Sequence, residues 1–196
     1  MTRISKLDLR DWDDELRRMT RADDATPLEQ GLMRIFAHRA PLAKGMIQFA
    51  GALKMHRSLP DRLVELVRLR VAFLNQCRSC MAIRYRDAVA DGVTEDLVCS
   101  LEKPVEAPDL TDAERCAIDY AERFATDHLS IGGETYDGLR RHFTEPAIVE
   151  LGMTIAFFVG FGRLAATLDM TEELPDAFRD HSRRLTPWRE QSIVVR

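Results

Sequence analysis

The sequence predicts an all-α protein of about eight or nine helices. Two observations favour this class. Apolar residues recur at helical spacing through most of the 196 residues, and no segment alternates apolar and polar residues as a half-buried strand does. The two Asp-Gly pairs, Asp91-Gly92 and Asp137-Gly138, are not flanked by alternating apolar runs, so neither predicts a hairpin turn.

Helix-start signals divide the first half of the chain. Residues 11–19 fit a short polar helix. Thr26-Pro27 places an N-cap before a first-turn proline, which predicts a helix through Phe36. Pro41 begins a third helix, and Ser58–Asp61 repeats the cap-and-proline pattern for a fourth, which ends just before the first cysteine.

The middle of the chain continues with shorter helices. A helix is expected from Cys80 to about Ala90, where Asp91-Gly92 supplies a glycine C-cap. Another short helix follows over 94–101. A loop punctuated by prolines then occupies 102–109.

The last third holds the most apolar segment. Thr111 and Glu114 form a capping box for one helix, and a further helix is expected over 134–142. Residues 148–168 predict a buried central helix. From 171 on the tail is polar and holds Pro175 and Pro187, so we expect it to wrap a surface or a neighbouring subunit instead of adding to the core.

Composition and charge exclude several classes of protein. Hydrophobic residues make up 45% and charged residues 31%, as in a soluble globular domain, and the net charge of −4 disfavours a dedicated nucleic-acid binder. No apolar run approaches the ~20 residues that span a bilayer. The first residues, MTRISK, lack the apolar stretch of a secretory signal, so we expect a cytoplasmic protein with no membrane partner.

The cysteines give the sharpest chemical signal. Cys77-Arg-Ser-Cys80 is a C-x-x-C, whereas Cys99 and Cys116 stand alone, and no two histidines are four residues apart. A zinc site of four ligands would need a second such pair, so neither a metal nor another cofactor is expected. In a reducing cytosol a lone C-x-x-C favours redox chemistry, and a helix N-terminus there would stabilise thiolate, most of all at Cys77.

Two charged residues are candidates to assist the thiols. Arg84 follows Cys80 by four residues, so on a helix its guanidinium would lie one turn away and favour the thiolate. The alternative is a surface arginine paired with Asp87 or Asp91. Glu65 lies in an apolar stretch twelve residues before Cys77; a buried carboxylate there could exchange a proton near neutrality.

The alternative for Glu65 is an ion pair with Arg68 or Arg70 of the same helix. Tyr85 is close to the cysteines in sequence and could donate a proton, although a tyrosine of the core or of a groove is the commoner case.

The segment from Leu59 to Cys80 resembles the carboxymuconolactone decarboxylase superfamily, and within it the alkyl hydroperoxidase D (AhpD)-like branch. There a Glu precedes by twelve residues a Cys-x-x-Cys that follows Leu-Asn, as Glu65 and Cys77 do here, and the run Asp87–Val93 fits the continuation. The resemblance covers roughly residues 40–170. It implies a single AhpD-like domain over 1–196, with its core at about 26–170 and a tail at 171–196.

The resemblance also implies an activity. Members are thiol-dependent peroxidases, usually trimers or hexamers. By that likeness Cys80 attacks a small-molecule hydroperoxide, Cys77 resolves the product into a disulfide, Glu65 is the relay acid, and an external dithiol resets the enzyme. The family's relay histidine is Arg84 here, and Ser79 replaces a histidine of some members, so no histidine relay is implied.

Two other functions stay open at this point. The same superfamily includes lyases that decarboxylate lactone acids, for which Arg84 could grip a carboxylate but the cysteine pair would be idle. The third interpretation is a non-catalytic oligomeric module whose dithiol senses the redox state.

Overall fold

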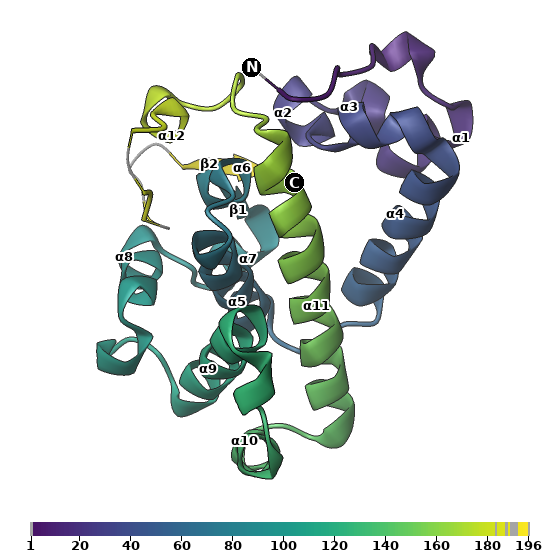
Figure 1. Ribbon diagram of the computed structural model, residues 1–196. Helices are drawn as coiled ribbons and strands as arrows, with labels where there is room; N and C mark the ends of the chain where they lie inside the picture. Colours follow the sequence, from purple (N-terminus) through teal and green to yellow (C-terminus); the bar gives the residue numbers. More distant parts are fainter. Residues whose placement is uncertain (1, 183, 187, 189–191, 196) are drawn as a thin grey trace.

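The computed structural model describes residues 2–182, 184–186, 188 and 192–195 (Figure 1). Within these residues nine α-helices have five residues or more, and three shorter α-helices add a single turn each. The all-α class is therefore confirmed. The elements are α1 (Asp14–Thr20), α2 (Pro27–Gln30), α3 (Met33–Phe36), α4 (Ala40–Met55), α5 (Asp61–Leu74), α6 (Arg78–Ala82), β1 (Ile83–Tyr85), α7 (Arg86–Ala90), α8 (Glu95–Cys99), α9 (Asp112–Thr126), α10 (Gly133–Arg140), α11 (Glu145–Leu168), α12 (Asp176–Arg179) and β2 (Ile193–Val195).

Capping residues begin the helices where the sequence predicts. At α9 the Thr111 N–H donates to Glu114 at 2.8 Å and the Glu114 N–H donates back to the Thr111 hydroxyl at 3.2 Å. Thr26 caps α2 in the same way. The single helix expected through Phe36 is broken, however, because Gly31 adopts a φ of +47° and ends α2 before α3 begins.

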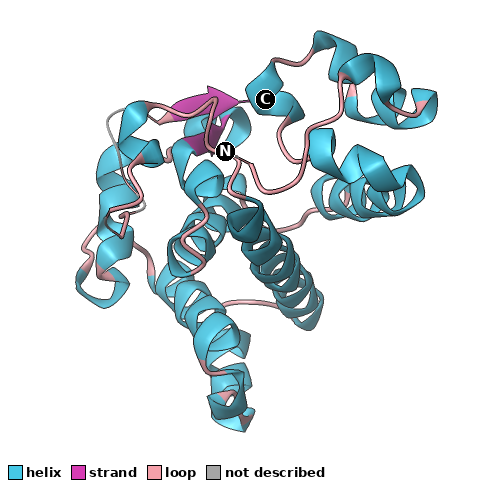
Figure 2. Cartoon of the chain, turned by 45° about the horizontal axis from the view of Figure 1, so that its top comes forward, coloured by secondary structure: helices cyan, strands magenta, loops and turns pink. Residues whose placement is uncertain are grey.

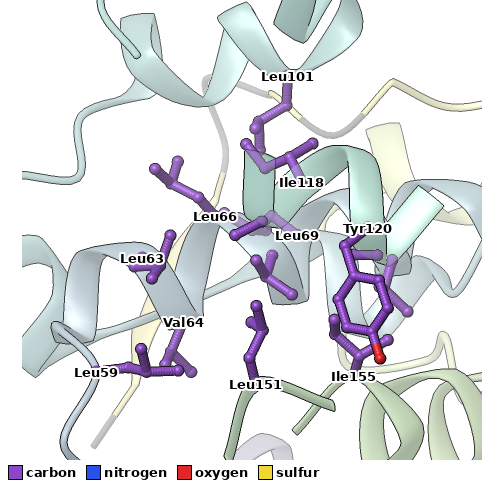
Figure 3. Close-up of a cluster of buried hydrophobic side chains, with 14 of the residues drawn as sticks. Leu59, Leu63, Val64, Leu66, Leu69, Leu101, Ile118, Tyr120, Leu151 and Ile155 are labelled. Carbon is purple, nitrogen blue, oxygen red and sulfur yellow. The ribbon is translucent and has the colours of Figure 1, made fainter. Parts of the chain in front are cut away.

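Helix α5 is the centre of the molecule and packs between α9 and α11 (Figures 1 and 3). Ten of its residues, from Leu63 to Ala72, are buried, so it is covered on nearly every side. Its leucines contact Ile118 of α9 and Leu151 of α11 within one apolar cluster. This packing fixes the end of α5, which leads directly to the cysteines.

From the sequence, no apolar run is expected to approach the length needed to span a bilayer, and helix α11 differs from this expectation. Its 24 residues form a helix that is long and apolar enough, by length and composition, to cross a membrane. One face carries Leu151 and Ile155 into the cluster on α5 and α9. The opposite face leaves Val149, Met153 and Leu164 exposed.

The helix expected from Cys80 to Ala90 is interrupted by a short strand. Helix α6 ends at Ala82, and β1 pairs in parallel with β2, with Ile83 opposite Ile193. Figure 2 shows these strands at one end of the long helices. The partner strand lies more than a hundred residues away, so local periodicity could not indicate this pairing.

The expectation that the tail adds nothing to the core is also wrong. Leu174, Phe178 and Leu185 are at most 4% exposed and form a cluster with Ala72 and Met81. These apolar residues are separated by charged residues and a proline, which hides their common face in the sequence. Pro187 and residues 183, 189–191 and 196 of the tail lie outside the described residues.

Candidate functional site

The two cysteines lie at the tight turn between α5 and α6. Gln76 adopts a left-handed φ of +50°, which reverses the chain after α5. Its side-chain amide accepts from the Leu185 N–H at 2.9 Å and donates to the Leu185 carbonyl at 3.0 Å. Cys77 and Cys80 form a disulfide with Cα atoms 5.2 Å apart. The tail therefore holds the turn that carries the disulfide.

The two sulfurs differ in their access to solvent. Cys77 is the N-cap of α6; its Sγ accepts from the Cys80 N–H at 3.3 Å, and the residue is 0% exposed. Cys80, on the first turn of α6, is half-buried and lines a cavity. A molecule in that cavity meets Cys80, with Cys77 behind it.

The cavity beside Cys80 has a volume of about 280 Å³ and a mostly apolar wall. Phe157 and Phe161 of α11 stack with ring centroids 4.9 Å apart, and Phe36 of α3 lies 6.3 Å from Phe161. The other apolar lining residues are Pro27, Leu28, Leu32, Met33, Met46, Ala72, Ile83, Phe158, Ala165 and Met170. The polar lining residues, besides Cys80, are Arg68, Ser79, Tyr85, Glu29, Gln30 and Glu173.

Glu65 is buried beside this site, in an ion pair with Arg68. Both residues are at most 4% exposed, and Arg68 donates from Nε and Nη2 to the two carboxylate oxygens at 2.6 and 2.8 Å. The Tyr85 N–H adds a bond to the same carboxylate at 3.3 Å. The ion pair expected as the alternative for Glu65 is thus confirmed, and it is Arg68, not Glu65, that lines the cavity.

The sequence suggests Arg68 only as a partner for Glu65, yet Arg68 also contacts the chain around Cys80. Its guanidinium donates to the carbonyl oxygens of Cys80 at 2.7 Å and Ile83 at 2.9 Å, and lies 5.0 Å above the Tyr85 ring. Burial disfavours its charge, but the attraction and hydrogen bonds of Glu65 hold the pKa of Arg68 above its ordinary value. The sequence signal for the position of Arg68 is its spacing of three residues from Glu65, which places both side chains on one face of a helix.

The helical spacing predicts that Arg84 lies one turn from Cys80, and this prediction is wrong. Because β1 is a strand, its side chains alternate: Ile83 and Tyr85 line the cavity, while Arg84 points the other way. Arg84 is 2% exposed and pairs with Glu95 at 2.8 and 3.0 Å, not with Asp87 or Asp91. Burial, only partly offset by Glu95, lowers the pKa of Arg84.

The described part of the chain gathers no group of three or more His, Cys, Asp or Glu side chains that could hold a metal ion. The other cysteines, Cys99 and Cys116, are free thiols, and partial desolvation together with nearby carboxylates raises the pKa of each, although Cys99 is exposed. The Cys77–Cys80 pair next to an apolar cavity can carry out the chemistry of a dithiol and a disulfide.

Comparison with known proteins supports the all-α fold. Residues 40–123 match the family model described as the carboxymuconolactone decarboxylase family. A peroxidase-related protein from Ralstonia eutropha JMP134, described as an alkylhydroperoxidase AhpD core, has 22% identity and a TM-score of 0.68 over 91% of this chain and 94% of its own. A peroxidase-related protein from Silicibacter sp. TM1040 has 18% identity and a TM-score of 0.65 over 91% and 97%.

The debrominase Bmp8, solved as a variant in complex with 2,3,4-tribromopyrrole, has 19% identity and a TM-score of 0.70 over 91% of this chain and 95% of its own. No curated protein matches the chain.

Proposed function

Because residues 40–123 match the carboxymuconolactone decarboxylase family model and the chain has an AhpD-like fold, we propose that it is a thiol-dependent peroxidase that cycles its Cys77–Cys80 pair between dithiol and disulfide. One observation carries the proposal. Cys80 alone of the two cysteines lines the cavity, and Cys77 lies behind it within bonding distance. A nucleophile facing the substrate with a resolving thiol behind it is the arrangement that such a cycle needs.

The reaction balances with the residues present and one external reductant. The Cys80 thiolate attacks the terminal oxygen of the hydroperoxide, the O–O bond breaks, and the alkoxide leaves and takes up a proton. The sulfur retains the other oxygen as a sulfenic acid. The Cys77 thiol then attacks that sulfur, water leaves, and the disulfide forms; a small external dithiol restores both thiols.

Arg68 and Tyr85 have supporting roles in this proposal. The buried, charged guanidinium of Arg68 lines the cavity next to Cys80, so it favours thiolate over thiol. Tyr85 lines the same cavity and is 38% exposed, so its hydroxyl is available to protonate the leaving alkoxide. Glu65 acts through Arg68 as a positioning residue, which replaces the relay expected from the family.

A second candidate is reductive removal of a halogen from an aromatic ring. The aromatic wall of the cavity favours a flat apolar substrate, and the fold is shared with Bmp8. An aryl halide and the dithiol would give the arene, halide, a proton and the disulfide. The lyase alternative loses Arg84 as its carboxylate-binding residue, because Arg84 pairs with Glu95 instead of facing the cavity.

Assembly and compartment belong to the same proposal. The exposed apolar face of α11 and the exposed Leu42 and Phe49 of α4 favour burial against further copies of the chain, so we propose a homo-oligomer. A cytoplasmic location would supply the dithiol reductant.

The test is steady-state turnover with cumene hydroperoxide and excess dithiothreitol, alongside 2,3,4-tribromopyrrole as the competing substrate. Wild type should consume the hydroperoxide, and Cys80→Ser should lose turnover by at least ~10³-fold. Cys99→Ser, which changes an exposed free thiol, should keep wild-type rates. Undiminished turnover in Cys80→Ser would refute the proposal. Consumption of the bromopyrrole alone would favour the second candidate, reductive removal of a halogen.

A further inference from the structure

A second cavity lies on the other side of the turn that carries the disulfide. Its volume is about 490 Å³, and its wall comes from the N-terminal segment, the ends of α5 and α11, the start of α6 and the tail. Ser79, Ala165 and Met170 line both cavities, so the two share a wall. Arg78 and Ser79, the two residues between the cysteines, both face the second cavity.

The lining of this second cavity is cationic. Arg3, Arg78 and Arg163 supply this charge, whereas Asp169 is the single carboxylate of the lining among the described residues. Asp169 already has a partner, since His181 lies 3.6 Å from it. The excess of arginines over carboxylates distinguishes this cavity from the apolar one beside Cys80.

Two of the arginines keep an uncompensated charge. Arg163 donates from Nε to the Asn75 side-chain oxygen at 3.1 Å and from Nη2 to the Ala125 carbonyl. Arg3 donates to the Thr167 carbonyl at 2.8 Å. These partners are neutral, and no described carboxylate lies within ion-pair distance of either guanidinium. The bonds hold both side chains at the cavity without neutralising them.

We propose that this cavity binds an oxyanion, the carboxylate or phosphate group of a small molecule. Guanidinium groups match the planar geometry of such oxygens and donate charge-assisted hydrogen bonds to them. The volume lies within the range of ~300–1,000 Å³ typical of small-ligand sites. The bound group would lie behind the residues that join the two cysteines. The site is independent of the peroxidase proposal.

The test is a titration of the full-length protein at low ionic strength with two probes, inorganic phosphate and succinate. Amide NMR shifts of residues 75–79 and 163–171 report the binding. Each probe is given to wild type, Arg163→Gln and Arg3→Gln. The matched control is Arg18→Gln, an exposed arginine of α1 outside both cavities.

We expect saturable shifts confined to these segments, about tenfold weaker binding in Arg163→Gln and in Arg3→Gln, and unchanged binding in Arg18→Gln. Arg163→Lys keeps the charge and should lose less affinity than Arg163→Gln. This difference in affinity is expected even if Arg163→Gln is less stable than wild type. Saturation by phosphate alone identifies a phosphate ester, and by succinate alone a carboxylate. The proposal is overturned if neither probe saturates, or if both Gln variants bind like wild type.

Discussion

The guanidinium of Arg68 donates a hydrogen bond of 2.7 Å to the main-chain carbonyl oxygen of Cys80. The same group holds both carboxylate oxygens of Glu65, so one buried ion pair ties the middle of α5 to the first turn of α6. The residue on which the site depends is therefore an arginine of α5, twelve residues before Cys80, and its effect can be separated from that of Arg84.

The stability cost of losing each arginine should differ. Arg68→Gln leaves Glu65, 2% exposed, without its charge partner, and should lower the free energy of unfolding by about 3–5 kcal/mol. Arg84→Gln leaves Glu95, whose side chain is 42% exposed and can be hydrated, so the loss should be about 1–3 kcal/mol. Urea denaturation of both variants measures this, and a larger loss in Arg84→Gln would contradict the assignment.

The reactivity of Cys80 should respond in opposite directions to the two members of the ion pair. In a Cys77→Ser background, Arg68→Gln removes a positive charge and should raise the pH midpoint of Cys80 alkylation by about one unit. Glu65→Gln removes the compensating negative charge and should lower that midpoint. Rates of iodoacetamide labelling of Cys80 across pH give both values, with Arg84→Gln in the same background as the control expected to match the Cys77→Ser parent. Shifts of the same sign would refute the electrostatic role.

Two glycines of α11 should respond oppositely to alanine. A Cβ on Gly162 would lie 2.7 Å from the Asn75 side-chain nitrogen, which donates to the Phe158 carbonyl. Because Asn75 also accepts from Arg163, it cannot move freely, and Gly162→Ala should cost about 1–3 kcal/mol. A Cβ on Gly160 meets nothing within 4 Å, so Gly160→Ala should stabilise the helix by about 0.5–1 kcal/mol. Thermal unfolding of Gly162→Ala and Gly160→Ala measures the two changes in stability. Equal changes would show that the Asn75 side chain moves to make room for the new methyl group.

Acid should release the contact between the N-terminal segment and the tail. Burial opposes the charge of Glu172, but hydrogen bonds from Lys6 and the Thr2 N–H lower its pKa from 4.5 to about 2. A carboxylate with a lowered folded-state pKa stabilises the fold above its unfolded pKa and loses that contribution as pH falls toward 2.

The stability difference between wild type and Glu172→Gln should thus be present at pH 6 and shrink steadily below pH 4.5. Urea denaturation at several pH values measures it. Because the side chain is 38% exposed, the difference should also fall with added salt. A difference that does not change between pH 6 and pH 3 would contradict the contribution of this ion pair.

The exposed face of α11 should govern assembly. Met153 is 46% exposed in the middle of that face, so Met153→Glu should convert an oligomer to smaller species. Val105, 90% exposed on the 3-10 helix Pro104–Glu106 before α9, supplies the control, because Val105→Glu adds the same charge away from α11. Light scattering gives the masses. A monomeric wild type, or an unchanged mass in Met153→Glu, would refute the proposed interface.

Local signals predicted much of this molecule. The caps at Thr26 and Thr111, the apolar run of α11 and the pairing of the two cysteines depend on residues close in sequence, and each is confirmed. The strand at 83–85 could not be predicted, because its partner is at 193–195. The orientation of Arg84 depends on that strand, so its partner Glu95 was missed as well. The burial of Phe178 depends on a cluster assembled from three parts of the chain.

The proposal that Cys80 attacks the hydroperoxide is tested most directly by identifying which sulfur is oxidised first. Reduced Cys77→Ser and Cys80→Ser are each mixed with one equivalent of cumene hydroperoxide in the presence of dimedone, and the adduct is mapped by peptide mass spectrometry. We expect a dimedone adduct on Cys80 in Cys77→Ser and none on Cys77 in Cys80→Ser, because Cys77 is fully buried. The assignment would be contradicted by no adduct on Cys80 in Cys77→Ser. It would also be contradicted by an adduct on Cys77 in Cys80→Ser that forms as fast as the Cys80 adduct in Cys77→Ser.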